Sequence, residues 1–186
     1  MIQPRSLGAT LEDLCRQPGK AELIGGRIVP LRVTGRKPNR IAGRIYRSLD
    51  DYAALTGKGE VFTDNIGFAV PVLPSGRESF SPDASFHFGP FGNDPMGLIQ
   101  SAPTFAVEVR SACDYGPAAE TEMAAKRADY FAAGTLAVWD VDPLAETIRV
   151  YRRSDPGHAV VYVRGQDAEA EPAVPGWTVK TDWIFG

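Results

Sequence analysis

Apolar side chains recur with a helical period in two long segments of the chain. Over residues 39–56 their spacings are four, four and three, and Gly57 follows. This pattern predicts one helix whose apolar stripe, expected to pack on a sheet, is Ile41, Ile45, Leu49 and Tyr52. A second helix is predicted over 117–133, because Pro117 suits a first helical position and Gly134 suits the position after the last one.

Short runs of alternating or β-branched residues predict extended strands around these helices. A short helix is also predicted at 11–17, a surface loop at 89–103 and a mobile loop at 167–173. The order of strands, helix and strands predicts an α/β (α+β) fold, with helices flanking one mixed central sheet, and a single domain over 1–186. The expected strands are 21–24, 27–33, 60–72, 80–88, 105–110, 136–142, 147–152 and 158–165.

The amino-acid composition favours a folded protein without a membrane-spanning segment. The chain has 186 residues, 44% of them hydrophobic and 23% charged with both signs mixed, so we expect a folded core rather than disorder. No apolar run approaches the ~20 residues that span a bilayer, and the start MIQPRSLGATLEDLC has no apolar segment of signal-peptide type. We therefore expect a cytoplasmic protein without a membrane partner. Cys15 and Cys113 fit neither a zinc site nor a disulfide framework.

Two acidic residues interrupt the expected strands. Because side chains alternate between the faces of a strand, Glu108 shares a face with Ala106, and Asp83 shares one with Ser85. If the two strands are neighbours, both carboxylates converge. Hard carboxylate ligands suit Mg²⁺ or Mn²⁺, which polarises a phosphoryl oxygen and lowers the pKa of a bound water. The alternative from spacing alone is a pair of salt bridges at a strand end.

A phosphate-cleaving site also needs a cation, and two residues are candidates. Arg110 lies two residues after Glu108 on the same expected strand face, where it contacts phosphate or neutralises the carboxylate. Lys126 lies at the edge of the apolar stripe of the second helix, from which a long side chain reaches over the sheet. That stripe is Met123, Arg127, Tyr130 and Phe131.

A basic segment stands out in a chain whose net charge is -3. Residues 27–47 hold seven basic side chains and no acidic one. Arg40, Arg44 and Arg47 follow helical spacing away from the apolar stripe, which favours contact with nucleic-acid phosphates; a solvated helix face is the alternative. His87 is expected to be a hydrogen-bonded structural residue rather than a ligand.

The order of segments along nearly the whole chain resembles the bacterial "putative restriction endonuclease" family of the PD-(D/E)XK nuclease superfamily. The resemblance implies that Asp83 is the aspartate of the Pro-Asp motif, Glu108 the acid of the second strand, and Lys126 the motif lysine displaced onto a helix. It also implies that Glu22 completes the site. The segments that carry it are ELIGGRIV, SPDASF, APTFAVEVRS, KRADYFAAG, LAVWDVDPLAETIRVYR and VPGWTVKTDWIF.

The sequence departs from the family pattern at a few positions. Arg110 stands where the family usually has an aliphatic residue, so it is expected to compete with a metal for Glu108. Asn39 stands where the family often has a histidine, and the loop after the second acid reads Ser111-Ala112-Cys113. None of these changes removes an expected metal ligand.

The function expected from the sequence is therefore a Mg²⁺-dependent endonuclease, with Mn²⁺ as the alternative ion. Asp83 and Glu108 are the expected metal ligands, and Glu22 and Lys126 assist catalysis. The substrate is a phosphodiester of nucleic acid, favoured as DNA, and the resemblance implies a homodimer. The competing hypothesis is a catalytically inactive domain that keeps the fold for nucleic-acid binding or oligomerisation.

Overall fold

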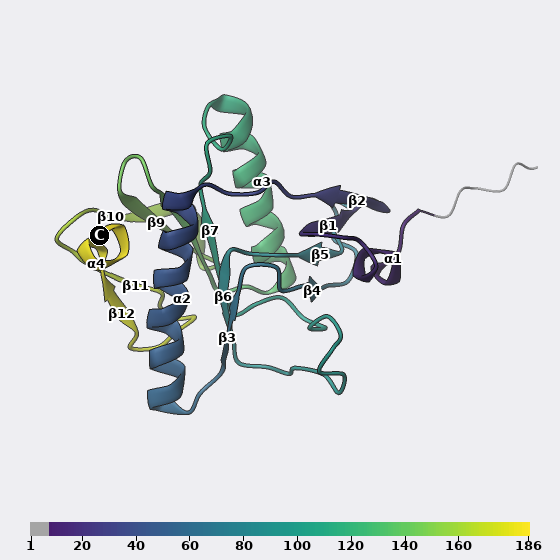
Figure 1. The fold of residues 1–186 in the computed structure, drawn as a ribbon, viewed down its shortest axis with the longest axis horizontal. Helices are drawn as coiled ribbons and strands as arrows, with labels where there is room; N and C mark the ends of the chain where they lie inside the picture. The colour runs from purple at the N-terminus through teal and green to yellow at the C-terminus, as the bar shows by residue number, and fades with distance from the viewer. Residues whose placement is uncertain (1–7) are drawn as a thin grey trace, which may run out of the picture.

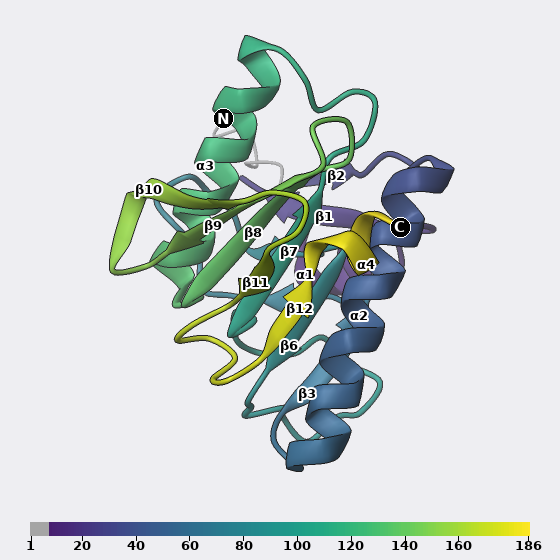
Figure 2. The same ribbon diagram turned by 90° about the vertical axis from the view of Figure 1, so that its left-hand side faces the viewer.

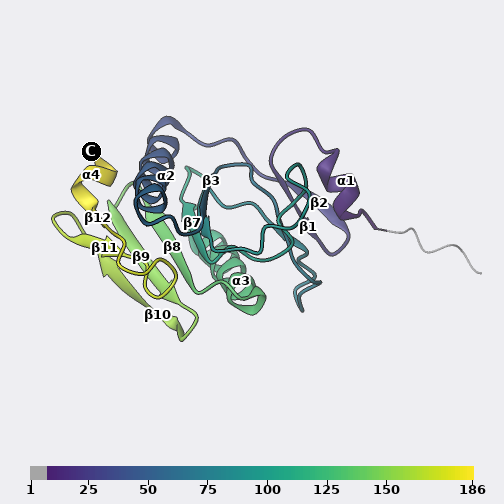
Figure 3. The same ribbon diagram turned by 90° about the horizontal axis from the view of Figure 1, so that it is seen from below.

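A six-stranded sheet forms the centre of the structure, and two long helices cover it from opposite sides (Figures 1 and 3). The computed structural model describes residues 8–186; residues 1–7, part of the stretch assessed for a signal peptide, lie outside the described residues. The helices are α1 (Leu11–Cys15), α2 (Arg36–Thr56), α3 (Pro117–Ala133) and α4 (Thr181–Phe185). In this described part of the chain, no helix is long and apolar enough to cross a membrane.

The strands are grouped into the central sheet and three small two-stranded sheets. The central order is β10-β9-β8-β7-β6-β3, and Figure 2 shows these strands side by side. The central strands are β3 (Glu60–Thr63), β6 (Ala84–His87), β7 (Phe105–Val109), β8 (Ala137–Asp142), β9 (Thr147–Arg152) and β10 (Asp155–Tyr162). The small pairs are β1 (Ala21–Ile24) with β2 (Arg27–Pro30), β4 (Phe68–Ala69) with β5 (Ser79–Phe80), and β11 (Asp167–Glu169) with β12 (Thr178–Lys180).

The central sheet is mixed. Strands β7 and β8 are parallel, and the other neighbouring pairs are antiparallel. A parallel pair needs a crossover connection, and α3 supplies it. The register sets Glu108 opposite Asp140 on β8 and Val107 opposite Ala84 on β6. The predicted mixed sheet with flanking helices is therefore confirmed.

The alternation predicted for the strand at 105–110 separates the two faces of the sheet. Phe105, Val107 and Val109 lie in the core cluster that contains the apolar stripe of α2. Ala106 lies in a second cluster with Tyr130 and Phe131 of α3. Glu108 therefore emerges on the α3 side of the sheet, two residues beyond a fully buried alanine.

Hydrogen bonds join the β1 hairpin to β5 and to the turn before it, and so fix the N-terminal strand in place. The Leu23 N–H donates to Ser79 Oγ at 2.7 Å, and the Gly25 N–H donates to the Gly76 carbonyl at 2.7 Å. A Cβ on Gly76 would lie 3.1 Å from the Gly25 Cα, and its φ is +86°, so this close approach favours glycine. The junction places Glu22 of β1 next to the central sheet.

Several sequence expectations need correction. The strands expected at 60–72 and 80–88 are each divided between the central sheet and the small β4–β5 sheet. Helix α2 begins at Arg36 rather than Asn39, which is possible because Pro38 lies in the first turn, where its missing N–H costs little. The mobile loop expected at 167–173 is wrong: its first residues form β11, and Ala168, Ala170 and Ala173 are fully buried. The small side chains pack in the core cluster of Trp139 and Trp177, and the Trp139 indole N–H donates to the Glu169 carbonyl at 3.1 Å.

His87 behaves as the structural residue that the sequence predicted. It ends β6 with 3% of its surface exposed, and its Nε2 lies 3.0 Å from Ser101 Oγ. Burial lowers the pKa of His87, and the Pro90 carbonyl and Glu60 only partly oppose this shift. The folded protein therefore holds the neutral imidazole.

This burial predicts a pH-dependent stability. Below about pH 6.5 the unfolded chain protonates His87 before the folded chain does, so the free energy of unfolding should rise with pH up to that value. Urea unfolding between about pH 5 and 7 should show this contribution in the wild type and lose it in His87→Gln. The other histidine, His158, is fully on the surface, so His158→Gln serves as the matched control. Curves for wild type and His87→Gln that stay parallel would contradict this prediction.

Candidate active site

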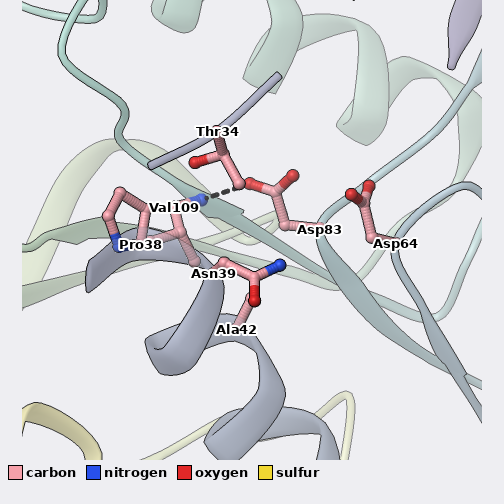
Figure 4. A pocket seen from close by; sticks show the side chains of 7 residues that line it. All are labelled: Thr34, Pro38, Asn39, Ala42, Asp64, Asp83 and Val109. Carbon is pink, nitrogen blue, oxygen red and sulfur yellow. Dashed lines mark hydrogen bonds between the residues drawn. The ribbon is translucent and has the colours of Figure 1, made fainter. Parts of the chain in front are cut away.

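Asp83 and Glu108 lie on neighbouring antiparallel segments, Asp83 just before β6 and Glu108 within β7. The Asp83 N–H donates to the Val107 carbonyl at 3.0 Å, which extends the β6–β7 ladder and sets Asp83 opposite Glu108. The Val109 N–H donates to Asp83 Oδ2 at 2.8 Å, and Figure 4 shows this bond. The two carboxyl side chains are 23% and 22% exposed, so solvent reaches both. The structure thus places Asp83 close enough to Glu108 for the two charges to interact.

Lys126 joins Glu108 to Glu22. Its Nζ lies 2.8 Å from Glu108 Oε1 and 3.0 Å from Glu22 Oε1, so one ammonium bridges two carboxylates. Glu22 is only 2% exposed and accepts a further hydrogen bond from the Ser81 N–H at 3.0 Å. Three of the four side chains expected at the site are therefore joined by ion pairs, one each from β7, α3 and β1. The fourth, Asp83, is paired with Lys20 instead and acts on Glu108 through its charge.

Two further residues of the site escaped the sequence analysis. The Arg77 guanidinium forms ion pairs with Glu22 and with Asp129 of α3, the latter at 2.9 Å. The Tyr130 hydroxyl donates to Glu108 Oε1 at 2.7 Å, one helical turn after Lys126. The spacing of Lys126 and Tyr130 on α3 was the available signal for the tyrosine. Arg77 forms an isolated β-bridge with Ile24 between a turn and β5, where no periodicity indicates the direction of a side chain.

A second lysine, Lys20, also escaped the sequence analysis. Its Nζ lies 2.8 Å from Asp83 Oδ1 and 2.5 Å from Asp64 Oδ1, and its side chain is 16% exposed. Lys20 immediately precedes β1, and Asp64 immediately follows β3. A single lysine after Pro18-Gly19 carries no pattern of its own, so only the packing of β1 beside the sheet reveals its partners.

The charges of the site control one another. Burial raises the pKa of Glu108, and the nearby Asp83 adds to this shift although Lys126 opposes it. Burial would lower the pKa of Lys126, but Glu108 and Glu22 outweigh it and raise that pKa above the usual value. For Glu22, Lys126 and Arg77 outweigh burial and lower the pKa. Lys126 is therefore a cation at neutral pH, suited to offset negative charge rather than to accept a proton.

Arg110 does not take the place expected for it. Its side chain is on the Glu108 face, as alternation predicted, but its Nε and Nη2 donate to the two Asp140 oxygens at 2.8 Å each. It also pairs with Glu120. Between residues 8 and 186 no ion pair joins Arg110 to Glu108, because Asp140 offers a bidentate partner on the neighbouring strand. The expected competition of Arg110 with a metal for Glu108 is absent from this arrangement.

The three arginines expected to contact nucleic acid have different surroundings. Arg40 and Arg47 are exposed on α2. Arg44 is half-buried, and its Nη1 donates to the Ile184 carbonyl of α4 at 3.0 Å. The N-terminal end of α2 lies beside Asp83, since Asn39 lines the same pocket as that residue (Figure 4). Two of the three arginines are therefore available to a ligand.

The donor set fits a hard divalent cation. Among residues 8–186 no group of three or more histidine, cysteine or acidic side chains is arranged to hold a metal ion. Mg²⁺, however, is commonly held by one or two carboxylates, with water and substrate phosphate completing its shell. Asp83 and Glu108 supply two such carboxylates, and Lys20 and Lys126 already place positive charge against them. Oxygen ligands that attract cations suit Mg²⁺ or Mn²⁺.

Arg77 is predicted to be essential for the stability of this cluster. Arg77→Met removes one of the two cations that neutralise buried Glu22, which should lower the free energy of unfolding by about 3 kcal/mol. Urea unfolding checks this value. Arg16→Met is the matched control, because Arg16 pairs with Glu12 on the surface and its loss should cost less than about 1 kcal/mol. Equal effects of the two substitutions would refute the role of Arg77.

Comparisons with known proteins bear on this site. The sequence matches the Uma2 family, described as "Putative restriction endonuclease", over residues 9–182. A similar solved structure is the crystal structure of a "putative nuclease belonging to DUF820" from Anabaena variabilis ATCC 29413. Its identity to this chain is 18%, the match covers 95% of this chain and 97% of that one, and the TM-score is 0.74. No curated protein matches the sequence.

At this identity the solved structure shows the fold, while the family match spans most of the chain. The expected restriction-endonuclease-like fold is confirmed, and the match agrees with the resemblance to PD-(D/E)XK nucleases. The chain belongs to the Uma2 family of "putative restriction endonucleases".

Proposed function

We propose that this protein is a metal-dependent endonuclease that hydrolyses phosphodiester bonds of DNA. The observation that carries the proposal is the Lys126 ammonium bound to Glu108 and Glu22, with Asp83 opposite Glu108 on the next strand. These are the acid, acid and lysine that the family resemblance assigns to catalysis. Both carboxylates are partly exposed, so a ligand in solvent can reach them.

Each residue has a distinct role in this proposal. Asp83 and Glu108 would hold Mg²⁺, which supplies polarisation of the phosphate and a more acidic bound water. Lys126 offsets the negative charge that develops on the phosphate and orients the attacking water through its ammonium. Glu22 and the Tyr130 hydroxyl keep Lys126 and Glu108 in place, since each makes a direct contact with its partner. Burial of these partners limits the rotamers that the two catalytic side chains adopt.

Lys126 is predicted to be required for cleavage. Lys126→Ala removes the charge nearest the expected phosphate, so Mg²⁺-dependent cleavage of a plasmid should fall by at least about a hundredfold. The variant should still bind Mn²⁺, and its circular dichroism spectrum should stay close to that of the wild type. Lys180→Ala, at an exposed lysine that pairs only with Asp167, is the control. A variant that cleaves as fast as the wild type would favour the catalytically inactive alternative, and cleavage of a matching RNA would test the choice of DNA.

The exposed arginines of α2 are predicted to contact phosphates. Replacing Arg40 and Arg47 with Gln should weaken binding to unrelated DNA sequences about equally and reduce the log-log salt slope by about 2. Arg44→Gln should leave this slope nearly unchanged, since its guanidinium is engaged with α4. The slope is measured by fluorescence anisotropy at several salt concentrations. An unchanged slope in the double variant would assign these arginines to a solvated helix face.

Four expectations from the sequence stay predictions. They are the homodimer, the cytoplasmic location, the extent of one domain over 1–186 and the choice of Mg²⁺ over Mn²⁺. The family resemblance supports the homodimer, and the length and composition of the chain support the single domain.

A further inference from the structure

Asp83 has both of its oxygens engaged by groups of the protein itself. Oδ2 accepts the Val109 N–H at 2.8 Å, and Oδ1 accepts the Lys20 ammonium at 2.8 Å. The first bond is between a backbone group and a carboxylate, so it leaves the negative charge of Asp83 in place. The second puts a full positive charge beside the carboxylate that a metal ion would use. Because like charges repel, a metal ion bound to Asp83 disfavours the Lys20 ammonium on Oδ1.

Lys20 has a second partner within reach of the same position. Asp64 Oδ1 lies 2.5 Å from the same Nζ, so the ammonium is shared between two carboxylates on different strand ends. Asp64 is more exposed than Asp83, at 44% against 23%, and both line the pocket of Figure 4. A small movement of the flexible lysine stem is enough to leave Asp83 while keeping Asp64.

We infer that Lys20 is an internal competitor for the metal at Asp83, and that Asp64 is the partner that retains it when the metal binds. This inference rests on the proposed function only in taking Asp83 and Glu108 as the metal ligands. Without metal, Lys20 neutralises Asp83 and limits the repulsion between the two facing carboxylates. With metal, the ion takes over that neutralisation, and Lys20 pairs with Asp64 alone. The metal affinity of the site is thereby set by a lysine that is not a ligand.

The competition predicts opposite effects for the two partners. Lys20→Met removes the competitor, so Mn²⁺ should bind about tenfold more tightly, the affinity change that about 1.4 kcal/mol produces. Lys20→Arg keeps the charge and should stay near the wild-type affinity. Asp64→Asn removes the alternative partner and leaves Lys20 on Asp83, so Mn²⁺ should bind several-fold more weakly. In the double variant Lys20→Met/Asp64→Asn, most of that loss should disappear, because no lysine remains to be retained.

The experiment titrates the full chain with Mn²⁺ and measures the free ion by electron paramagnetic resonance, without nucleic acid. Asp83→Asn defines which binding belongs to the site, Lys58→Met is the exposed-lysine control, and urea unfolding confirms that each variant is folded. Asp83-dependent binding that is equal or weaker in Lys20→Met overturns the inference. So does an Asp64→Asn loss that persists in full without Lys20, since Asp64 would then act directly on the metal. Absence of Asp83-dependent binding in every variant would overturn the proposed metal site as well.

Discussion

The ion pair network centred on the Lys126 ammonium is the interaction on which the site depends. Lys126 reaches from α3 to Glu108 on β7 and to Glu22 on β1, and so holds three elements distant in sequence. Burying Glu22 at 2% exposure is unfavourable unless positive charge surrounds it. Lys126 and Arg77 provide that charge, one from the helix and one from the turn before β5. The position of β1 beside the sheet, and with it the position of Lys20, follows from this requirement.

The same network explains why a strongly acidic cluster is tolerated in a folded chain. Burial raises the pKa of Glu108, and the negative charge of the nearby Asp83 adds to this shift. Lysines on two sides of the pair, Lys20 and Lys126, counter this repulsion without closing the site to solvent. Carboxylates that bind lysine ammonium groups also attract a metal ion. The site is therefore suited to exchange one of its lysines for a metal.

The elements and the faces of the central strands followed from the sequence, because periodicity directly reports which side chains are buried. Alternation placed Glu108 with Ala106, and helical spacing placed Lys126 at the edge of the core stripe. Contacts made by turn residues did not follow. Lys20 and Arg77 lie where no period applies, and their partners depend on how β1 docks. The prediction for the segment at 167–173 failed because it also depended on tertiary packing. Alanines in a charged stretch suggest a loop, but their small side chains pack against two tryptophans.

Of the two candidate cations, the one on the same strand face as Glu108 is not the one that contacts it. Arg110 shares the face of Glu108, yet the carboxylate of Asp140 on the next strand binds it through two hydrogen bonds. An arginine so held is fixed in its charge and in its direction. Lys126 lies 18 residues after Glu108 in the sequence. Its side chain reaches Glu108 because α3 crosses back over the sheet between β7 and β8. Asp140 thus holds Arg110 away from Glu108, and Lys126 of α3 is the cation that pairs with Glu108.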